Sequence, residues 1–196
     1  VDRREAEPIY HVHKRPGKKI VLFMGRFTFQ KGPEYFVEAA AKVLAARPEV
    51  SFIMAGAGDL LPQMIERVAE RGIGRRVHFT GFLDGADIER VFALSDLYVM
   101  PSVSEPFGIT PLEAMLRDVP VIISKQSGVG EVLRHVPKVD FWDVDALAAT
   151  IVAILTRPDL AADIVARSRE ELEPLRWENA ARKVIDVYRT LFDPSP

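Results

Sequence analysis

Short apolar runs alternate with amphipathic stretches from Lys19 onward, and this alternation restricts the fold of the chain more than any other feature of its sequence. The runs are apolar almost without interruption rather than at every second position, which is typical of strands covered on both faces. Each run is followed by a stretch with apolar residues at helical spacing. The runs are residues 20–24, 50–55, 77–80, 97–100 and 119–123. Together they predict an α/β fold, a doubly wound, Rossmann-like parallel sheet with helices on both faces.

The second part of the chain adds a short sixth strand near residues 139–141 and then helices alone. A helix is expected from Val129 to Val136, because apolar residues at helical spacing lie between Gly128 and Pro137. The final helices are expected at residues 145–155, 158–172 and 177–192. The last of them carries an apolar stripe, part of which is expected to be exposed or to lie in a contact between molecules.

Residues 1–18 are polar, contain Pro8, Pro16 and Gly17, and show no sustained period. They are therefore expected to form a leader or interdomain linker, and residues 19–196 one Rossmann-like domain that includes the C-terminal helices. A full-length protein would more naturally begin close to its first strand. The chain is accordingly expected to be part of a longer one.

The composition argues against several functional classes. With 26 basic and 28 acidic residues and a formal net charge of -2, the chain offers no electrostatic case for binding nucleic acid or an anionic membrane. It has no cysteine, and therefore no disulfide and no thiolate metal site, which fits a cytoplasmic protein. No apolar run approaches the roughly 18 residues that a membrane span needs. No metal site is expected, because two of the four histidines, His11 and His13, fall in the linker, and the other two, His78 and His135, lie elsewhere in the chain.

The turn after the first strand carries two cations. Gly25-Arg26 follows the strand, and Lys31-Gly32 stands just before the next helix. A glycine at a strand end lets the backbone approach a ligand, and an arginine and a lysine near a helix start suit a diphosphate. The stretch matches neither the Walker loop nor the G-x-G-x-x-G dinucleotide pattern. The alternative interpretation is that both cations are ordinary solvated surface residues.

Two carboxylates, Glu105 and Glu113, follow the fourth strand with seven residues between them. The carboxyl ends of parallel strands are where open α/β sheets bind ligands. The amides of Phe107, Gly108 and Ile109 would point from a helix start at an anionic phosphate. Glu105, on the loop before them, would reach past the phosphate to a polar group. Alternatively, Glu105 caps the helix.

Glu113 is expected at the edge of that helix, beside a buried stripe formed by Ile109, Leu112, Met115 and Leu116. A carboxylate there needs a donor partner, which vicinal ribose hydroxyls could supply. The alternative is an ordinary surface residue. Taken alone, the two glutamates also suggest the acid and base of glycoside hydrolysis.

A glycine-bearing turn, Ser127-Gly128-Val129-Gly130-Glu131, follows the fifth strand at the same edge of the predicted sheet. One interpretation is that Gly128 allows close approach to a sugar. The other is a plain turn with a glutamate at a helix start.

These segments, in this order and spacing, resemble the C-terminal, donor-binding half of the retaining GT-B type glycosyltransferases of family four (group 1). That family includes sucrose synthase-like and mannosyltransferase enzymes. The resemblance runs from about Lys19 to Phe192. It is carried by Gly25-Arg26 with Lys31-Gly32, by residues 55–58, by residues 77–82, by Asp96 ahead of Pro101-Ser102, and above all by Glu105 and Glu113 as an E-x7-E element.

The resemblance implies a site for a nucleoside diphosphate sugar, with UDP as the favoured nucleotide and neither a metal nor another cofactor. Arg26 and Lys31 would neutralise the donor diphosphate. Glu105 would contact the hydroxyls of the sugar and Glu113 those of the ribose. Further donor contacts are implied for Gly25, for Phe82 and Leu83 near the nucleobase, for the amides around Phe107, Gly108 and Ile109, and for Gly128.

The implied reaction moves the sugar to an acceptor hydroxyl with retained anomeric configuration. Two departures from the family pattern matter. Residues 134–140 are shorter than the glycine-rich loop of relatives and lack glycine, so the contacts of that loop are not carried over. The acceptor-binding N-terminal half is missing, and any membrane association is expected only through it. The chain alone is therefore expected to bind nucleotide weakly and to transfer sugar poorly or not at all.

Two other functions stay open from the residues. One is a non-catalytic module that binds a nucleotide or nucleotide sugar. The other is a nicotinamide oxidoreductase domain on the same type of sheet, against which the missing glycine fingerprint argues.

Overall fold

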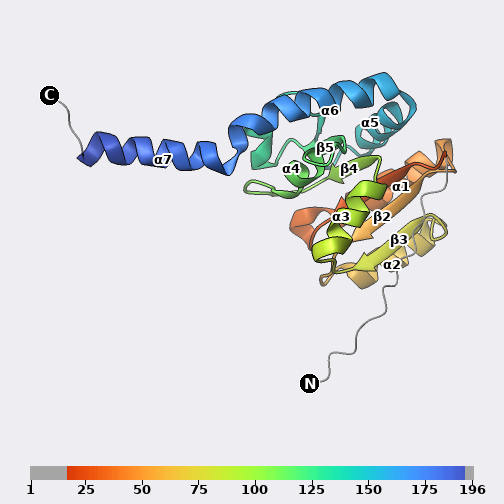
Figure 1. Ribbon diagram of the computed structural model, residues 1–196. Helices are drawn as coiled ribbons and strands as arrows, with labels where there is room; N and C mark the ends of the chain where they lie inside the picture. The colour runs from red at the N-terminus through yellow and green to blue at the C-terminus, as the bar shows by residue number, and fades with distance from the viewer. Residues whose placement is uncertain (1–16, 193–196) are drawn as a thin grey trace.

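The computed structural model describes residues 17–192, which form a parallel sheet between layers of helices (Figure 1). Neighbouring strands all pair in parallel, in the order β3-β2-β1-β4-β5-β6. The strands are β1 (Ile20–Met24), β2 (Ser51–Ala55), β3 (Val77–Gly81), β4 (Leu97–Met100), β5 (Val121–Ser124) and β6 (Lys138–Val139). The predicted doubly wound, Rossmann-like sheet with a short sixth strand is confirmed. The predicted leader lies outside the described residues except for its last two.

Three of the described helices begin at residue types that favour a helix N-terminus. Pro33 and Pro158 each begin a helix, and the Asp143 carboxylate caps another by accepting from the Ala146 amide at 2.9 Å. The helices are α1 (Pro33–Ala46), α2 (Leu61–Glu70), α3 (Gly85–Leu94), α4 (Thr110–Met115), α5 (Val144–Thr156), α6 (Pro158–Leu172) and α7 (Trp177–Phe192). Short 3-10 turns are η1 (Phe29–Lys31), η2 (Gly128–Glu131) and η3 (Glu173–Leu175).

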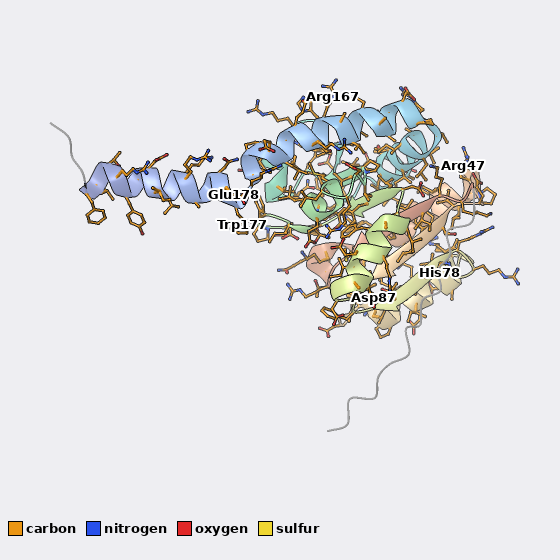
Figure 2. All side chains as sticks on the ribbon, in the orientation of Figure 1. Arg47, His78, Asp87, Arg167, Trp177 and Glu178 are labelled. Carbon is orange, nitrogen blue, oxygen red and sulfur yellow. The ribbon has the colours of Figure 1, made fainter. Side chains whose placement is uncertain are left out.

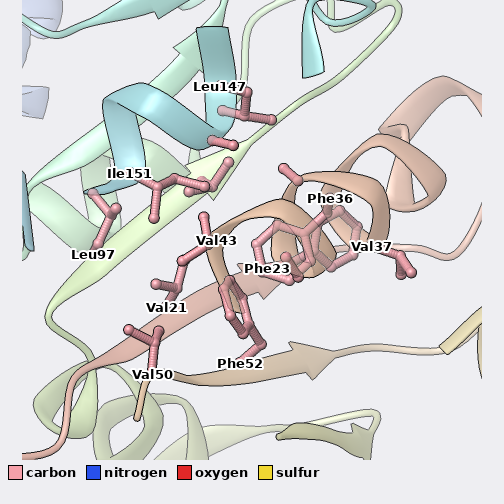
Figure 3. Packing of buried hydrophobic residues seen from close by; sticks show 14 of the residues in the cluster. Val21, Phe23, Phe36, Val37, Val43, Val50, Phe52, Leu97, Leu147 and Ile151 are labelled. Atoms are coloured by element: carbon pink, nitrogen blue, oxygen red, sulfur yellow. The ribbon is translucent and has the colours of Figure 1, made fainter. Parts of the chain in front are cut away.

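Each face of the sheet has its own hydrophobic core. Val21 and Phe23 of β1 face α1, α2 and α5, whereas Ile20 and Leu22 face α3 and α4. Figure 3 shows the first core, in which the Phe23 and Phe36 rings lie 5.5 Å apart between centroids. Because successive residues of a strand point to opposite faces, burial on both faces explains the continuous apolar runs.

The predicted helix from Val129 to Val136 is wrong, because this segment forms only the 3-10 turn η2 before it becomes irregular. The amides of Gly128 and Val129 donate to carbonyls of the 105–107 segment, which holds the chain in another path. Gly130, within the predicted helix, also weakens it. The apolar residues Val129, Leu133 and Val136 are nevertheless buried as a group.

The buried stripe predicted for the helix after β4 is only partly correct. Met115 is 1% exposed, but Ile109 and Leu116 are 63% and 69% exposed. The reason is the length of α4: a six-residue helix turns few positions toward the sheet, and Pro111, Ala114 and Met115 occupy them. Ile109 precedes the helix as its N-terminal flanking residue.

Helix α7 projects from the domain as a separate rod (Figure 1). Trp177, labelled in Figure 2 where the rod leaves the domain, is 85% exposed, and Phe192 at its other end is 80% exposed. The predicted exposure of part of the apolar stripe is confirmed. Among residues 17–192, no helix combines the length and apolarity needed to cross a membrane.

Candidate functional site

The topology brings the loops after β1 and β4 together. These two strands are neighbours although they are far apart in sequence, and the strand order reverses between them. The loop after β1 contains Arg26 and Lys31, and the loop after β4 contains Glu105. In open α/β sheets, a crevice at this reversal is the usual ligand site.

Lys31 and Glu105 form an ion pair at this edge. The side chains are 26% and 10% exposed, so the pair is largely shielded from water. Glu105 does not cap a helix, since Ile109 holds that position before α4. For Lys31 and Glu105, the interpretation as ordinary surface or capping residues is therefore wrong. The sequence predicts that both belong to one site, but not that they bind each other.

Arg26 differs from Lys31 in having no protein partner. Its side chain is exposed, and within residues 17–192 it makes neither a hydrogen bond nor an ion pair. A guanidinium carries five N–H donors and cannot lose its charge. Arg26 can therefore offer all its donors to an anion at this edge.

Two glycines allow the loops of the site to approach one another. A side chain on Gly32, whose φ is 61°, would place Cβ 2.2 Å from the Pro101 carbonyl oxygen after β4. A Cβ on Gly56 would lie 1.9 Å from the carbonyl oxygen of Gly25. Gly25 itself has room, because the nearest atoms to its Cβ would be Lys31 side-chain carbons at 3.8 and 3.9 Å. The role of Gly25 as a donor contact remains a prediction.

The segment from Phe107 to Ile109 carries three backbone N–H groups without a described partner, although Gly108 itself is buried. Gly108 has φ of 100°, a conformation that favours glycine, and Phe107 is 41% exposed. No hydrogen bond among the described residues uses the amides of Phe107, Gly108 or Ile109. These amides are therefore unused within the described residues, and their binding of an anionic group remains a prediction.

Glu113 lies in the first turn of α4 and is half-buried. Its carboxylate makes no hydrogen bond in the part of the chain that the structure describes, while its backbone carbonyl accepts from Arg117 Nη1 at 2.6 Å. A half-buried carboxylate without a donor is free to accept from hydroxyl groups.

A groove of about 1020 Å³ opens beside Glu113. One wall consists of the 107–116 segment, and the other of the end of α6, η3 and the start of α7. The α7 wall includes Trp177 and Ala180, which the sequence does not predict as part of a site. The apolar residues in the groove are Phe107, Ile109, Leu112, Met115, Leu116, Leu172, Leu175, Trp177 and Ala180.

Phe82 and Leu83 follow β3, the edge strand, and therefore lie at the far end of the same sheet edge. Phe82 is 78% exposed, and Leu83 packs against the core under α3. Gly128 lies next to the Glu105 loop, where its amide donates to the Glu105 carbonyl at 2.9 Å. That amide is therefore already in use.

Tyr98 of β4 lies beneath the site and is not predicted by sequence reasoning. Its ring is 1% exposed, and its hydroxyl donates to the Met24 carbonyl at 3.3 Å. Burial raises the pKa of the Tyr98 phenol well above its ordinary value, and the negative charges of Glu105 and Glu113 raise it further. The phenol therefore keeps its proton. The sequence feature that could have pointed to Tyr98 is its hydroxyl, because the other residues of this strand are apolar.

In the described part of the chain, no group of three or more histidine, aspartate and glutamate side chains is arranged to hold a metal ion. The site is instead built from two cations, two carboxylates and exposed backbone amides. The sheet defines an α/β domain of the doubly wound class, with this candidate site at its carboxyl edge.

Comparison with known proteins gives the family. The model of the glycosyl transferases group 1 family matches residues 8–171, and the chain belongs to this family. An uncharacterized glycosyltransferase of Methanocaldococcus jannaschii is 32% identical over 177 residues, which make up 88% of this chain and 45% of the relative. The chain thus spans about half the length of that relative. The predicted family resemblance is confirmed.

Solved structures agree on the fold. HepE of Anabaena, solved in complex with UDP-glucose, has a TM-score of 0.80 at 23% identity, covering 89% of this chain and 49% of HepE. A C-terminal domain of LpcC, a group 1 protein of Francisella tularensis, has a TM-score of 0.72 at 24% identity, covering 79% of this chain and 84% of that domain. These likenesses show the GT-B type C-terminal fold.

Proposed function

We propose that this chain is the donor-binding half of a retaining, hexosyl-type glycosyltransferase. It binds a nucleoside diphosphate sugar, whose sugar passes to an acceptor hydroxyl. The observation that carries the proposal is the edge where the Lys31–Glu105 ion pair meets the unpartnered Arg26, in a chain of the glycosyl transferases group 1 family.

The proposed roles of the residues combine their chemistry with the resemblance to the family. Arg26 and Lys31 neutralise the diphosphate, and the amides of Gly108 and Ile109 bind its oxygens. Glu105, held against Lys31, accepts from hydroxyls of the sugar. Glu113 accepts from the ribose hydroxyls. The backbone near Phe82 and Leu83 contacts the nucleobase. Further backbone contacts with the donor come from the segments near Gly25, Phe107 and Gly128.

In the proposed reaction, the bond between the anomeric carbon and the diphosphate oxygen breaks, and the acceptor oxygen forms its bond on the same face of the sugar. The departing diphosphate takes the proton of the acceptor hydroxyl. Such a step asks the protein chiefly to stabilise the charge that develops on the diphosphate. Arg26, Lys31 and the free amides supply that stabilisation, and the scheme needs no metal.

UDP is the favoured nucleotide of the proposal, because it is the commonest in the family and because the structurally similar HepE was solved with UDP-glucose. The acceptor is assigned to the other half of a longer, cytoplasmic protein, since this chain spans about half of its relatives. No nucleic acid takes part. The chain alone is proposed to bind donor weakly and to transfer sugar poorly or not at all.

Calorimetry with UDP, GDP, ADP and NAD tests the proposal. We expect one nucleoside diphosphate, UDP first among them, to bind most tightly, because the cations at the edge match a diphosphate with a free terminal charge. Tightest binding of NAD without a response to the diphosphates would favour an oxidoreductase domain and contradict the proposal. Donor binding without any transfer in a two-domain protein would instead identify a non-catalytic module.

A further inference from the structure

The loop that carries Glu105 has no helix or strand of its own, yet it is fixed from two sides. On one side, the Gln30 carbonyl accepts from the Val103 amide at 2.9 Å and from the Ser104 amide at 3.3 Å. On the other side, Glu105 and Ser127 form an isolated parallel β-bridge. The loop thus lies between the turn that carries Lys31 and the turn after β5.

The contact with the turn after β5 continues the pairing of β4 with β5. The last paired residues of these strands are Met100 and Ile123. Beyond them, the Gly128 amide donates to the Glu105 carbonyl at 2.9 Å, and the Val129 amide donates to the Phe107 carbonyl at 2.7 Å. Two backbone hydrogen bonds therefore bracket Pro106 and set the position of the Glu105 main chain.

Gly128 makes this approach possible. A Cβ at Gly128 would lie 2.0 Å from the Pro106 carbonyl oxygen and 2.8 Å from its carbonyl carbon, far inside contact distance. Gly128 is not among the glycines with positive φ, so its backbone conformation is open to other residues. The close approach alone requires glycine here.

The turn that receives Glu105 is itself anchored in the core. The hydroxyls of Ser124 and Ser127 lie 2.7 Å apart and are buried, and Val129 is fully buried. The turn therefore has little freedom to move away from a side chain placed on Gly128. A displacement would fall on the Glu105 loop, which is held by backbone hydrogen bonds and by the ion pair of Glu105 with Lys31.

We infer that Gly128 is a positioning residue for Glu105. By admitting the Pro106 carbonyl, it lets the turn after β5 hold Glu105 at the place where its carboxylate meets Lys31. The inference rests on the proposed function in one respect, namely that Glu105 contacts the sugar of the donor. Gly128 then acts through Glu105 and the loop, and its amide, which already donates to the Glu105 carbonyl, does not supply the donor contact proposed for the backbone near it.

The test compares Gly128→Ala with Gly130→Ala, a matched control in the same turn. A Cβ on Gly130 would meet only side-chain carbons, at 3.6 Å or more, which is ordinary contact. The readout is the ratio of UDP-glucose affinity to UDP affinity, which isolates the contribution of the sugar. Gly128→Ala should lower this ratio about tenfold or more, as expected when a hydrogen bond to a charged group is lost, and Gly130→Ala should leave it unchanged.

A double-mutant cycle with Glu105→Gln separates positioning from general damage. If Gly128 acts through Glu105, the ratio of UDP-glucose affinity to UDP affinity should be no lower in the double variant than in Glu105→Gln alone. Additive losses, or an unchanged ratio in a folded Gly128→Ala variant, would overturn the inference.

Hydrogen exchange in the unaltered chain gives a second test that needs neither nucleotide nor substitution. The amides of Gly128 and Val129 should exchange at least about tenfold more slowly than those of the exposed residues Phe107 and Ile109, which donate no hydrogen bond among the described residues. Equally fast exchange would show that the turn does not hold the loop. A chain that binds neither UDP nor UDP-glucose would refute the proposed function, while the exchange rates would still decide the positioning.

Discussion

Lys31 and Arg26 share one turn but differ in what surrounds them. Lys31 is partly buried against Glu105, so its removal would also leave a carboxylate without its partner. Arg26 is exposed and has no partner within residues 17–192, so its removal orphans no group there. Arg26 is therefore the cleaner probe of diphosphate binding.

Arg26→Ala should weaken binding of UDP by about 1.5 to 3 kcal/mol, the range for a hydrogen bond to a charged group. Calorimetry of the variant and the unaltered chain at one ionic strength measures the difference. The melting temperature should stay the same, because the side chain makes no described contact that stabilises the fold.

Arg75→Ala is the matched control for Arg26→Ala. Arg75 is also exposed and without a described partner, but it precedes β3 at the opposite edge of the sheet. Its loss should leave UDP affinity unchanged. Equal effects of the two substitutions would mean that only the net charge of the chain matters, and that Arg26 is an ordinary surface cation.

Helix α4 carries Glu113 and is tied to α6 at its end. The Asp118 carboxylate, just after α4, accepts from Nε and Nη2 of Arg169, both at 2.6 Å. These hydrogen bonds hold the pKa of Asp118 below its ordinary value. Asp118 also has φ of 58°, a conformation that aspartate and asparagine tolerate better than most residues. The ion pair thus connects two elements that line the groove.

Asp118→Asn should lower the melting temperature by about 1–3 °C at neutral pH, since an exposed ion pair with two hydrogen bonds stabilises a fold only slightly. Asparagine keeps the tolerance for positive φ, so the change removes chiefly the charge. A carboxyl with a lowered folded pKa stabilises above its unfolded pKa, about 3.9, and this stabilisation is lost as pH falls through the folded value.

The difference between Asp118→Asn and the unaltered chain should therefore vanish in acid. Thermal unfolding followed by circular dichroism from neutral pH downward measures it. Asp59→Asn, at an exposed loop position without a described partner, is the control and should show no difference at any pH. A deficit for Asp118→Asn that persists at low pH would point to packing or backbone strain instead of the ion pair.

In the whole molecule, most of the fold could be predicted, because strands that are buried on both faces of the sheet require continuous apolar runs in the sequence. Continuous apolar runs such as residues 97–100 indicate a parallel strand without any knowledge of its neighbours. The expected location of the candidate site follows from the same order, since loops after parallel strands share one edge. The membership in a glycosyltransferase family rests on motifs at that edge and is confirmed by the family match.

What could not be predicted depends on backbone contacts between distant segments. The apolar spacing after β5 predicts a helix, but the amides of Gly128 and Val129 donate hydrogen bonds to the Glu105 loop instead. The pairing of Lys31 with Glu105 and the exposure of Ile109 depend likewise on how two loops and one short helix pack. No local pattern in the sequence predicts such contacts between distant segments.

The most direct measurement is a titration of the ¹⁵N-labelled chain with UDP and UDP-glucose, followed through its amide signals. We predict that the largest changes fall in residues 25–31 and 105–113, at the carboxyl edge of β1 and β4, while residues 47–50 and 71–76 at the opposite edge stay constant. Changes concentrated at that opposite edge, or no change with either ligand, would contradict the assignment of this domain as the donor-binding half of a glycosyltransferase.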